Sequence, residues 1–497
     1  MTPPYPESPE PPRDPAAALE AVLAVPDPLA DAPTIEFIPA ETTPAALPRG
    51  PGAPGLSRQI WILALPMLGE QVGNFTVGLV DTWLAGHLSK EATAAVGTAA
   101  YVGWFVGLAL LLLSTGAAAL VSRSCGAGDR PTANRALNQA FLIMLALGLG
   151  ASVVAWLAAP WFATFLGQTE QARDLFVMYL RIDAFSYLAL AVLTVVGTVL
   201  RASGDTRTPM AIMLLVNVVN VLVASSLVFG WFWPSSGVRG IAFGTLTARC
   251  VGGVLALVLV LYGWRELRLG WHALRVDWDI IWRMLRIGLP GGGDAALMAT
   301  SQLLFIWIIA HTASGAAATA NYAAHMIAVR MEAITYLPAM AWMTAAATLV
   351  GQYLGARQPD KAARAAHVAV LQGALLTTGV AVAFFLLADP IFTTFSGDAQ
   401  VRAVGVPAFR LLAFAQPFLC TGIIYIGALR GAGDTRYTMA ISLIAGLCVR
   451  VPAAYLGGIV LGGGLIGAWC GMWADNLVRL LLALGRYLHG GWKRIKV

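Results

Sequence analysis

The sequence predicts an all-α integral membrane protein with twelve transmembrane helices in two six-helix lobes, related by a pseudo-two-fold axis along the membrane normal. Three observations lead to this fold: the composition, a succession of long apolar runs, and repeated sequence blocks. Apolar residues make up 58% of the 497 residues and charged residues only 12%. Soluble proteins carry about 25% charged residues. So few charges cannot cover a soluble globule of this size, which excludes an ordinary soluble protein.

Residues 1–57 differ in composition from the rest of the chain. They hold 15 of the 27 prolines and eight acidic but only two basic residues. No basic, apolar and small-residue series typical of a secretory signal is present there. We therefore expect a disordered Pro- and acid-rich cytoplasmic tail.

From residue 58 onward, long apolar runs alternate with short polar breaks. The runs are continuous and do not alternate polar with apolar residues, so they predict helices and not the strands of a membrane barrel. The expected spans lie near 60–84, 94–120, 137–160, 177–200, 208–232, 239–262, 286–310, 318–350, 366–388, 405–429, 437–461 and 464–486.

The basic residues predict the orientation of these spans. The even-numbered breaks and the stretch 485–497 hold 19 Lys and Arg residues, whereas the odd-numbered breaks hold six. Basic loops stay in the cytoplasm, so both termini are expected there. Because the basic residues are spread over six separate loops, no nucleic-acid partner is expected.

Two pairs of sequence blocks indicate an internal duplication. LRASGDTRTPM (200–210) and LRGAGDTRYTM (429–439) match at seven of 11 positions with an offset of 229, and the stretches Leu120–Ala136 and Leu349–Ala365 share that offset. Six spans per repeat give both halves the same orientation, with a cavity between them that suits alternating access. The predicted parts after the tail are an N-lobe (58–263), a cytoplasmic interlobe linker (264–285), a C-lobe (286–486) and a basic cytoplasmic tail (487–497).

Acidic residues within the spans are candidate functional residues. A carboxylate at the centre of a membrane helix costs roughly 2.5–3.5 kcal/mol. Glu70 and Asp81 are 11 residues apart, so they share a face of the first span about 16 Å apart along the axis, and Asn74 lies on that face too. The stripe indicates either an ion or proton path or a packed polar seam.

Other polar residues leave similar alternatives open. Glu70 and Asp294 each follow a proline by four residues, so each could bind a cation or proton near freed carbonyl groups, or be a structural carboxyl. Glu332 lies in the middle of the eighth span, where function and structural pairing are both open. Asp475 and Arg479 are spaced to pair directly.

The remaining candidates are uncharged. Asn217 and Asn220 share one face of the fifth span, where they could bind an ion or substrate or tie helices together. Aromatic residues and a methionine could contact flat cationic ligands or simply pack in the core or at the interface; they are Trp83, Tyr101, Trp104, Met331 and Tyr336.

The chain resembles the multidrug and toxic compound extrusion (MATE) transporters of bacterial type over about residues 58–486. The matching stretches are LALPMLGEQVGNFTVGLVDTWLAGHL, AAHMIAVRMEAITYLPA, LVGQYLGARQPDKA, and the loops LRASGDTR and GALRGAGDTR. This resemblance implies export of cationic amphiphilic compounds in exchange for H⁺ or Na⁺. It places Asp81 on the coupling aspartate of the family, Asn220 on an asparagine of its lobe 1 site, and Glu332 on a glutamate common in bacterial members.

The chain also departs from the family. Ala224 stands where some members carry an acid four residues after the asparagine. Met298 and about Leu419 stand where others carry cation-binding acids in the second lobe. These departures favour H⁺ over Na⁺, although Na⁺ at Asp81 stays open, and no cofactor or other metal is expected.

The sequence therefore predicts a proton-coupled multidrug efflux antiporter, a monomer in the bacterial inner membrane whose partners are cationic drugs or toxins and the lipid bilayer. The alternative is a lipid-linked precursor flippase of the same superfamily; we preferred the exporter because the expected cavity residues are mostly acids. A channel is less expected, because no segment resembles a selectivity filter. An enzyme is not expected, because the six histidines form no HExxH pattern and no Gly-rich phosphate loop is present.

Overall fold

The computed structural model describes residues 55–166, 170–231, 234–264, 267–270 and 275–495. All of them belong to one compact unit of the chain, and its named elements are helices. The predicted tail 1–57 lies almost wholly outside the described residues.

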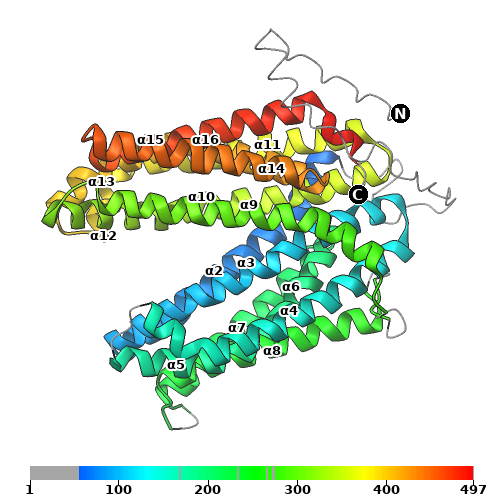
Figure 1. Cartoon of the computed structure of the whole chain (residues 1–497), viewed down its shortest axis with the longest axis horizontal. Coiled ribbons are helices and arrows are strands. Elements are labelled where there is room, and N and C mark those ends of the chain that lie inside the picture. Colours follow the sequence, from blue (N-terminus) through cyan, green and yellow to red (C-terminus); the bar gives the residue numbers. More distant parts are fainter. Residues whose placement is uncertain (1–54, 167–169, 232–233, 265–266, 271–274, 496–497) are drawn as a thin grey trace, which may run out of the picture. The chain divides into compact units, whose positions relative to one another are not determined.

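The first lobe contains α2 (Leu56–Leu88), α3 (Lys90–Ala127), α4 (Arg130–Phe165), α5 (Glu170–Ala184), α6 (Ser186–Ser203), α7 (Arg207–Phe229) and α8 (Val238–Tyr262). The second lobe contains α9 (Trp278–Ala310), α10 (Gly315–Gly355), α11 (Pro359–Leu386), α12 (Ala388–Phe395), α13 (Ala399–Gly431), α14 (Thr435–Ser442), η2 (Leu443–Arg450), α15 (Val451–Tyr455), η3 (Leu456–Val460), α16 (Gly464–His489) and η4 (Gly491–Arg494). Figure 1 shows these two groups as two separate bundles.

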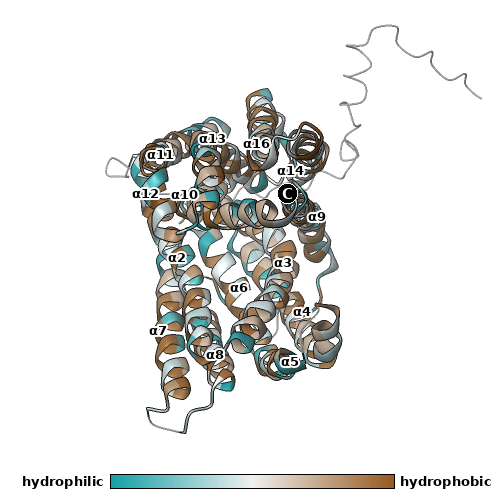
Figure 2. Cartoon of the chain, turned by 90° about the vertical axis from the view of Figure 1, so that its left-hand side faces the viewer, coloured by the Kyte–Doolittle hydropathy of each residue, from teal (hydrophilic) through white to brown (hydrophobic). Residues whose placement is uncertain are grey.

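Every predicted span coincides with one helix or with consecutive helical segments. Among the described residues, eleven helical stretches are long and apolar enough to cross a membrane. The remaining span is α2, which has the length at 33 residues but carries the polar stripe of Glu70, Asn74 and Asp81. Figure 2 shows apolar residues over most of the helical surface. The twelve-span, two-lobe fold is therefore confirmed.

Two spans are less regular than predicted. The fourth is divided between α5 and α6 at Phe185, beside Asp183 and Ser186, whose side chains bind Arg249 of α8. The eleventh contains two π-helical segments, η2 and η3, and the carbonyl oxygen of Gly446 in η2 accepts a hydrogen bond of 2.8 Å from Ser301 Oγ. The periodicity of apolar residues in the sequence does not predict either irregularity, because both involve side chains from other helices.

The first helix belongs to both lobes. Its first three turns place Ile60, Leu63, Ala64 and Met67 in the hydrophobic core of the second lobe, beside Trp342. The rest of α2 packs on α7 and α3 of the first lobe. The helix therefore connects the two bundles and presents its middle, with Glu70, to the space between them.

The lobes meet where glycines allow backbone to approach backbone. A Cβ atom at Gly116 of α3 would collide with the carbonyl oxygen of Met284 in α9, and one at Gly288 of α9 with that of Leu112. A Cβ atom at Gly355 of α10 would likewise collide with the carbonyl oxygen of Arg123. These contacts lie toward the predicted cytoplasmic ends of the helices.

Two helices extend beyond the predicted lobe boundaries. The helix α9 begins at Trp278, eight residues before the predicted start of the C-lobe at 286, because Asp277 caps α9 by accepting a hydrogen bond from Ile280 N. At the other end, α16 continues to His489, and Trp492 of η4 is fully buried and stacked on Tyr487. The final residues are therefore part of the second lobe up to this tryptophan.

Candidate functional site

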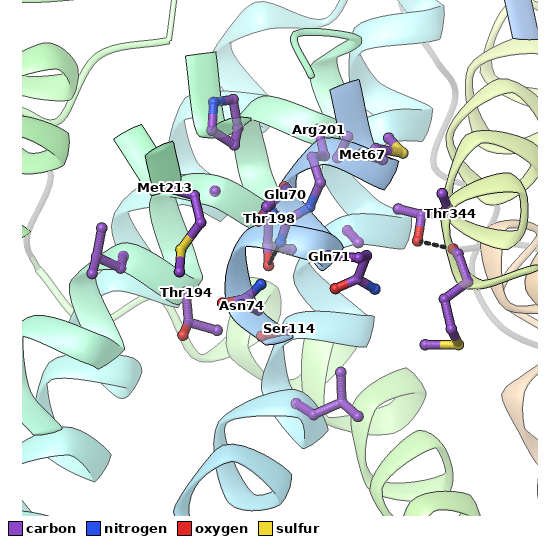
Figure 3. A pocket seen from close by; sticks show the side chains of 18 of the residues that line it. Met67, Glu70, Gln71, Asn74, Ser114, Thr194, Thr198, Arg201, Met213 and Thr344 are labelled. Atoms are coloured by element: carbon purple, nitrogen blue, oxygen red, sulfur yellow. Dashed lines mark hydrogen bonds and ion pairs between the residues drawn. The ribbon is translucent and has the colours of Figure 1, made fainter. Parts of the chain in front are cut away.

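A cavity of about 470 Å³ lies between the lobes. Its walls come from α2, α3, α6, α7 and α8 of the first lobe and from α10 and α13 of the second. Glu70, Gln71, Asn74 and Ser114 give it a polar side, and Figure 3 shows Asn74 and Gln71 beside Glu70. Methionines such as Met67 and Met213 add adaptable apolar surface. This mixture suits ligands that are partly apolar.

The Glu70 carboxylate forms an ion pair within this cavity. Its Oε1 lies 2.6 Å from Arg201 Nη1, and Arg201 Nη2 donates to Thr198 Oγ1 at 3.2 Å. Figure 3 shows these three side chains directed toward one another. Arg201 stands in the last turn of α6, which ends at Gly204 with a left-handed φ of 96°. The pair therefore joins the middle of α2 to the end of α6.

The second lobe repeats this ion pair. Arg430 Nη2 lies 2.5 Å from Asp294 Oδ2, and Ser442 donates a short hydrogen bond to the other oxygen of Asp294. Arg201 and Arg430 are the same position of the repeated LRxxGDTR block, and both line the cavity. The repeat thus conserves a bridge from the first helix of each lobe to the end of its fourth span.

Asp81 has a different environment. Its side chain is buried, with 7% of the residue exposed, between α2, α7 and α8. Thr245 Oγ1 donates to Asp81 Oδ2 at 3.0 Å, and Asn220 Nδ2 lies 3.4 Å from Oδ1 and 3.2 Å from Thr245 Oγ1. Asn220 and Thr245 line the cavity. The described residues place no basic side chain within 4.0 Å of this carboxylate.

The two asparagines of α7 both leave an oxygen without a partner. Asn217 Nδ2 donates to the carbonyl oxygen of Met213 at 2.9 Å, and the amide packs on Gly73 of α2. Within the described residues, the buried Oδ1 atoms of Asn217 and Asn220 accept no hydrogen bond. A buried amide oxygen without a donor is costly. Asn220 is among the described lining of the cavity, whereas Asn217 is not.

The other acids within the spans are mostly paired with arginines. Asp183 Oδ1 lies 2.8 Å from Arg249 Nη1. Asp475 binds both Arg479, at 3.0 Å, and Arg450, at 3.2 Å. The predicted pairing of Asp475 with Arg479 is therefore confirmed, whereas the contribution of Arg450 from η2 was not predicted.

Glu332 has no arginine partner among the described residues. Its Oε1 accepts from Gln416 Nε2 at 3.3 Å, and Gln416 Oε1 accepts from Thr335 Oγ1 at 2.6 Å. Met331 and Tyr336 lie on the same helix, and Tyr336 is 37% exposed. None of these three predicted residues is among the described lining of the 470 Å³ cavity.

The aromatic residues of the first lobe also lie outside that lining. Trp83, Tyr101 and Trp104 are exposed in the described part of the chain, and Trp83 packs on Phe229 of α7 with ring centroids 6.1 Å apart. Asn74 is the member of the predicted substrate set that lines the cavity.

The charge of the cavity differs from the sequence expectation of mostly acids. Arg201, Arg249 and Arg430 line it together with Glu70, and each arginine is matched by a carboxylate. The sequence alone did not predict these ion pairs or the role of Thr245. The repeated LRxxGDTR block could have identified Arg201 and Arg430. The signal for Thr245 is its position four residues before Arg249, on the same helix face.

Two six-helix lobes that enclose a cavity with buried charges around it are typical of a membrane transporter. The MatE family model matches residues 66–225 and 292–456. The protein therefore belongs to the MatE family of multi-pass membrane transporters.

Relatives extend over nearly the whole chain. The probable multidrug resistance protein NorM of Thermotoga maritima is 30% identical over 443 residues, which cover 89% of this chain and 94% of that protein. The multidrug resistance protein MdtK of Edwardsiella ictaluri is 26% identical over 409 residues, covering 80% and 87%.

Solved structures show the same fold. An outward-facing MATE family transporter of the MOP superfamily aligns with a TM-score of 0.79 at 21% identity, covering 88% of this chain and 95% of that one. A MOP superfamily transporter from Pyrococcus furiosus, described as having reversed binding-pocket polarity, aligns with a TM-score of 0.80 at 20% identity, covering 89% and 98%.

Proposed function

We propose that this protein is a secondary active multidrug efflux antiporter that exports cationic amphiphilic compounds in exchange for H⁺ by alternating access. The observation that carries the proposal is the environment of Asp81. This buried carboxylate has only hydroxyl and amide partners among the described residues, while Glu70, Asp183, Asp294 and Asp475 each have an arginine. The names of the relatives support multidrug efflux as the process.

The coupling step follows from this environment. Arg249 acts on Asp81 electrostatically from beyond 4.0 Å but is already paired with Asp183, so an ionised Asp81 adds a negative charge that a proton or a cationic ligand would neutralise. Asn220 and Thr245 reach both Asp81 and the cavity, so protonation would alter the polar groups that the substrate meets. Competition of H⁺ and substrate for one negative charge is the simplest coupling that these residues permit.

The choice of H⁺ over Na⁺ rests on the donor set. Na⁺ favours several oxygen ligands, whereas one proton satisfies one carboxylate. The side-chain oxygens that could bind an ion here are those of Asp81, Asn220 and Thr245. One turn further along α7 stands Ala224, which has no side-chain oxygen to add. We therefore propose H⁺ as the coupling ion, with both termini in the cytoplasm and the lobes closed on that side.

Dye export from proteoliposomes tests the proposal. Ethidium export by the full chain is expected under a pH gradient without Na⁺, and it is expected to fall at least tenfold in Asp81→Asn. Asp360→Asn, which removes an exposed carboxylate paired with Lys493, is the matched control and should export normally. Export by Asp81→Asn at the normal rate would contradict the coupling role.

The coupling ion and the substrate class are tested by two further experiments. Export driven by a Na⁺ gradient alone would contradict H⁺ coupling while leaving efflux intact. Movement of a lipid-linked anionic probe, without ethidium export, would favour the flippase alternative. The three arginines that line the cavity are all paired with carboxylates, so the charge of the cavity alone does not select a cationic or an anionic substrate. The experiment with the anionic probe makes this distinction.

A further inference from the structure

We infer that the first lobe carries a binding site for an anionic phospholipid, in a hollow between α4, α5 and α8 at the end opposite the interlobe contacts. This hollow measures about 860 Å³ and is lined by Arg173, Arg181 and Arg239 together with Glu170 and Asp174. The inference is separate from the proposed coupling at Asp81, because it concerns a different face of the lobe.

The gathering of arginines is unexpected on this side of the membrane. The odd-numbered breaks, which the topology places outside, contain six basic residues in all. Three of these six meet in this one hollow. Basic residues are scarce in such breaks because they oppose the positive-inside rule. Their convergence from α5 and α8 therefore calls for a partner.

The corresponding arginines of the second lobe can be compared with those of the hollow. Arg173 and Arg181 correspond to Arg402 and Arg410 at the offset of 229. Both lobes stack the second arginine on an aromatic ring of a preceding helix: Arg181 Cζ lies 5.0 Å from the Trp156 ring, and Arg410 Cζ lies 5.6 Å from the Phe385 ring.

The second lobe neutralises its arginine and the first does not. Arg410 Nη2 lies 2.8 Å from Asp389 Oδ2. The stretches AAPWFATF (158–165) and ADPIFTTF (388–395) align at an offset of 230, one residue more than the arginines, so that Ala159 stands in place of Asp389. Within the described ranges, neither Arg181 nor its neighbours Arg173 and Arg239 form an ion pair within 4.0 Å. Arg181 Nε is buried without a hydrogen-bond acceptor there, as are Arg402 Nε and Arg410 Nε in the second lobe, so the difference between the lobes is the ion pair of Arg410 with Asp389.

The walls of the hollow fit a lipid and not a soluble anion. Val177, Ile182 and Phe243 line it beside the arginines, and Phe243 is 44% exposed. The exposed side chains of Leu157, Trp161 and Phe165 continue the apolar surface along α4. Trp161 and Phe165 stack with centroids 5.1 Å apart, as interfacial aromatics do at headgroup level.

The geometry therefore provides for both parts of a phospholipid. Guanidinium groups bind phosphate oxygens through paired N–H donors, which would satisfy Arg181 and the Nη groups of Arg239, whose Nε donates to Met178 Sδ at 2.9 Å. The acyl chains would cover the apolar faces of α4 and α8. Figure 2 shows the hydrophilic surface of α5 between these two helices. Glu170 and Asp174 leave the hollow with a net charge of about +1, which matches one phosphodiester.

Native mass spectrometry of the full chain in mild detergent tests this site by counting bound phosphatidylglycerol against phosphatidylcholine. The first phosphatidylglycerol is expected to bind at least tenfold more tightly than phosphatidylcholine. Each arginine near an anionic headgroup contributes about fivefold. The variant Arg173→Gln/Arg181→Gln/Arg239→Gln should weaken this binding by about a hundredfold, and Arg239→Gln alone by about fivefold.

The matched control is Arg402→Gln/Arg410→Gln, which removes the corresponding charges from the second lobe. It should retain the first phosphatidylglycerol within twofold of the unmodified chain. Equal binding of both lipids, unchanged binding by the triple variant, or an equal loss in the control would each overturn the inference. The readout is lipid binding, so a failure of proton coupling would leave this result unaffected.

Discussion

At the scale of single residues, the arrangement of charges separates Asp81 and Glu332 from the other carboxylates in the membrane. Each of the others lies within 3.2 Å of an arginine nitrogen. Taking a charge out of a buried ion pair leaves its partner uncompensated, which costs several kcal/mol. Asp81 and Glu332 instead have neutral partners, so they can gain or lose a cation without breaking a pair.

A first prediction concerns the hydroxyl that supports Asp81. Thr245→Val removes the donor to Asp81 Oδ2 at nearly constant volume. A hydrogen bond to a charged group is worth about 1.5–3 kcal/mol, so losing it disfavours the ionised carboxylate. The pH profile of ethidium export should therefore move to higher pH by about one unit or more. Thr247→Val, two residues further along α8, is the control, and an identical shift in that variant would contradict the assignment.

A second prediction concerns the Glu70–Arg201 bridge. Glu70→Gln leaves Arg201 as an unpaired positive charge in the cavity, which should raise the KM for ethidium about tenfold through repulsion. Glu70→Gln/Arg201→Gln removes both charges and should restore most of the affinity.

The thermal unfolding of the unmodified chain, Glu70→Gln, Arg201→Gln and the double variant gives an independent measure. A double-mutant cycle should yield a coupling of at least about 1 kcal/mol for this half-buried pair. Equal KM values for the single and double variants would show that the charge of Arg201 does not act on the substrate.

At the scale of helices, the sequence predicted the spans far better than the contacts between them. Continuous apolar runs and the shared offset of 229 were sufficient for twelve spans in two lobes. The partners of Glu70 and Asp294 lie 131 and 136 residues away along the chain, on helices whose rotation no local pattern reports. Asp81 was predicted to be a functional residue from its position within an apolar helix. Its partner Thr245 was not, because threonines are common in apolar helices.

A third prediction concerns the glycine contacts between the lobes. Gly355→Ala would place a methyl group against the backbone of Arg123. Overpacking of this kind costs about 1–3 kcal/mol, which would shift the balance toward separated cytoplasmic ends by about fivefold to 150-fold. Spin labels at Arg130→Cys and Lys361→Cys should then report a longer mean distance.

Gly107→Ala is the matched control for this change. A Cβ atom at Gly107 of α3 would have open space around it. The control should leave the label distance unchanged, and an unchanged distance in Gly355→Ala as well would contradict the closing role of these contacts.

At the scale of the whole molecule, the two lobes share one bridge and differ in the rest. Both tie the first helix to an arginine at the end of the fourth span. The second lobe extends this bridge through Ser442 and Arg479 to Asp475 and Arg450, so Asp294 and Asp475 are both paired with arginines. Asp81 and Glu332 both have neutral partners in the described part of the chain, but Asn220 and Thr245 beside Asp81 line the cavity, whereas Gln416 beside Glu332 is not among its described lining. This difference is the basis for a single coupling site at Asp81.

The most direct test of that claim counts the protons released when a cationic substrate binds. Calorimetric titration of the full chain with tetraphenylphosphonium, in Na⁺-free buffers of different ionisation enthalpy at the acidic end of the transport range, gives this number. Close to one proton should be released per bound cation by the unmodified chain, and none by Asp81→Asn. Equal proton release by both proteins would contradict a single coupling site at Asp81.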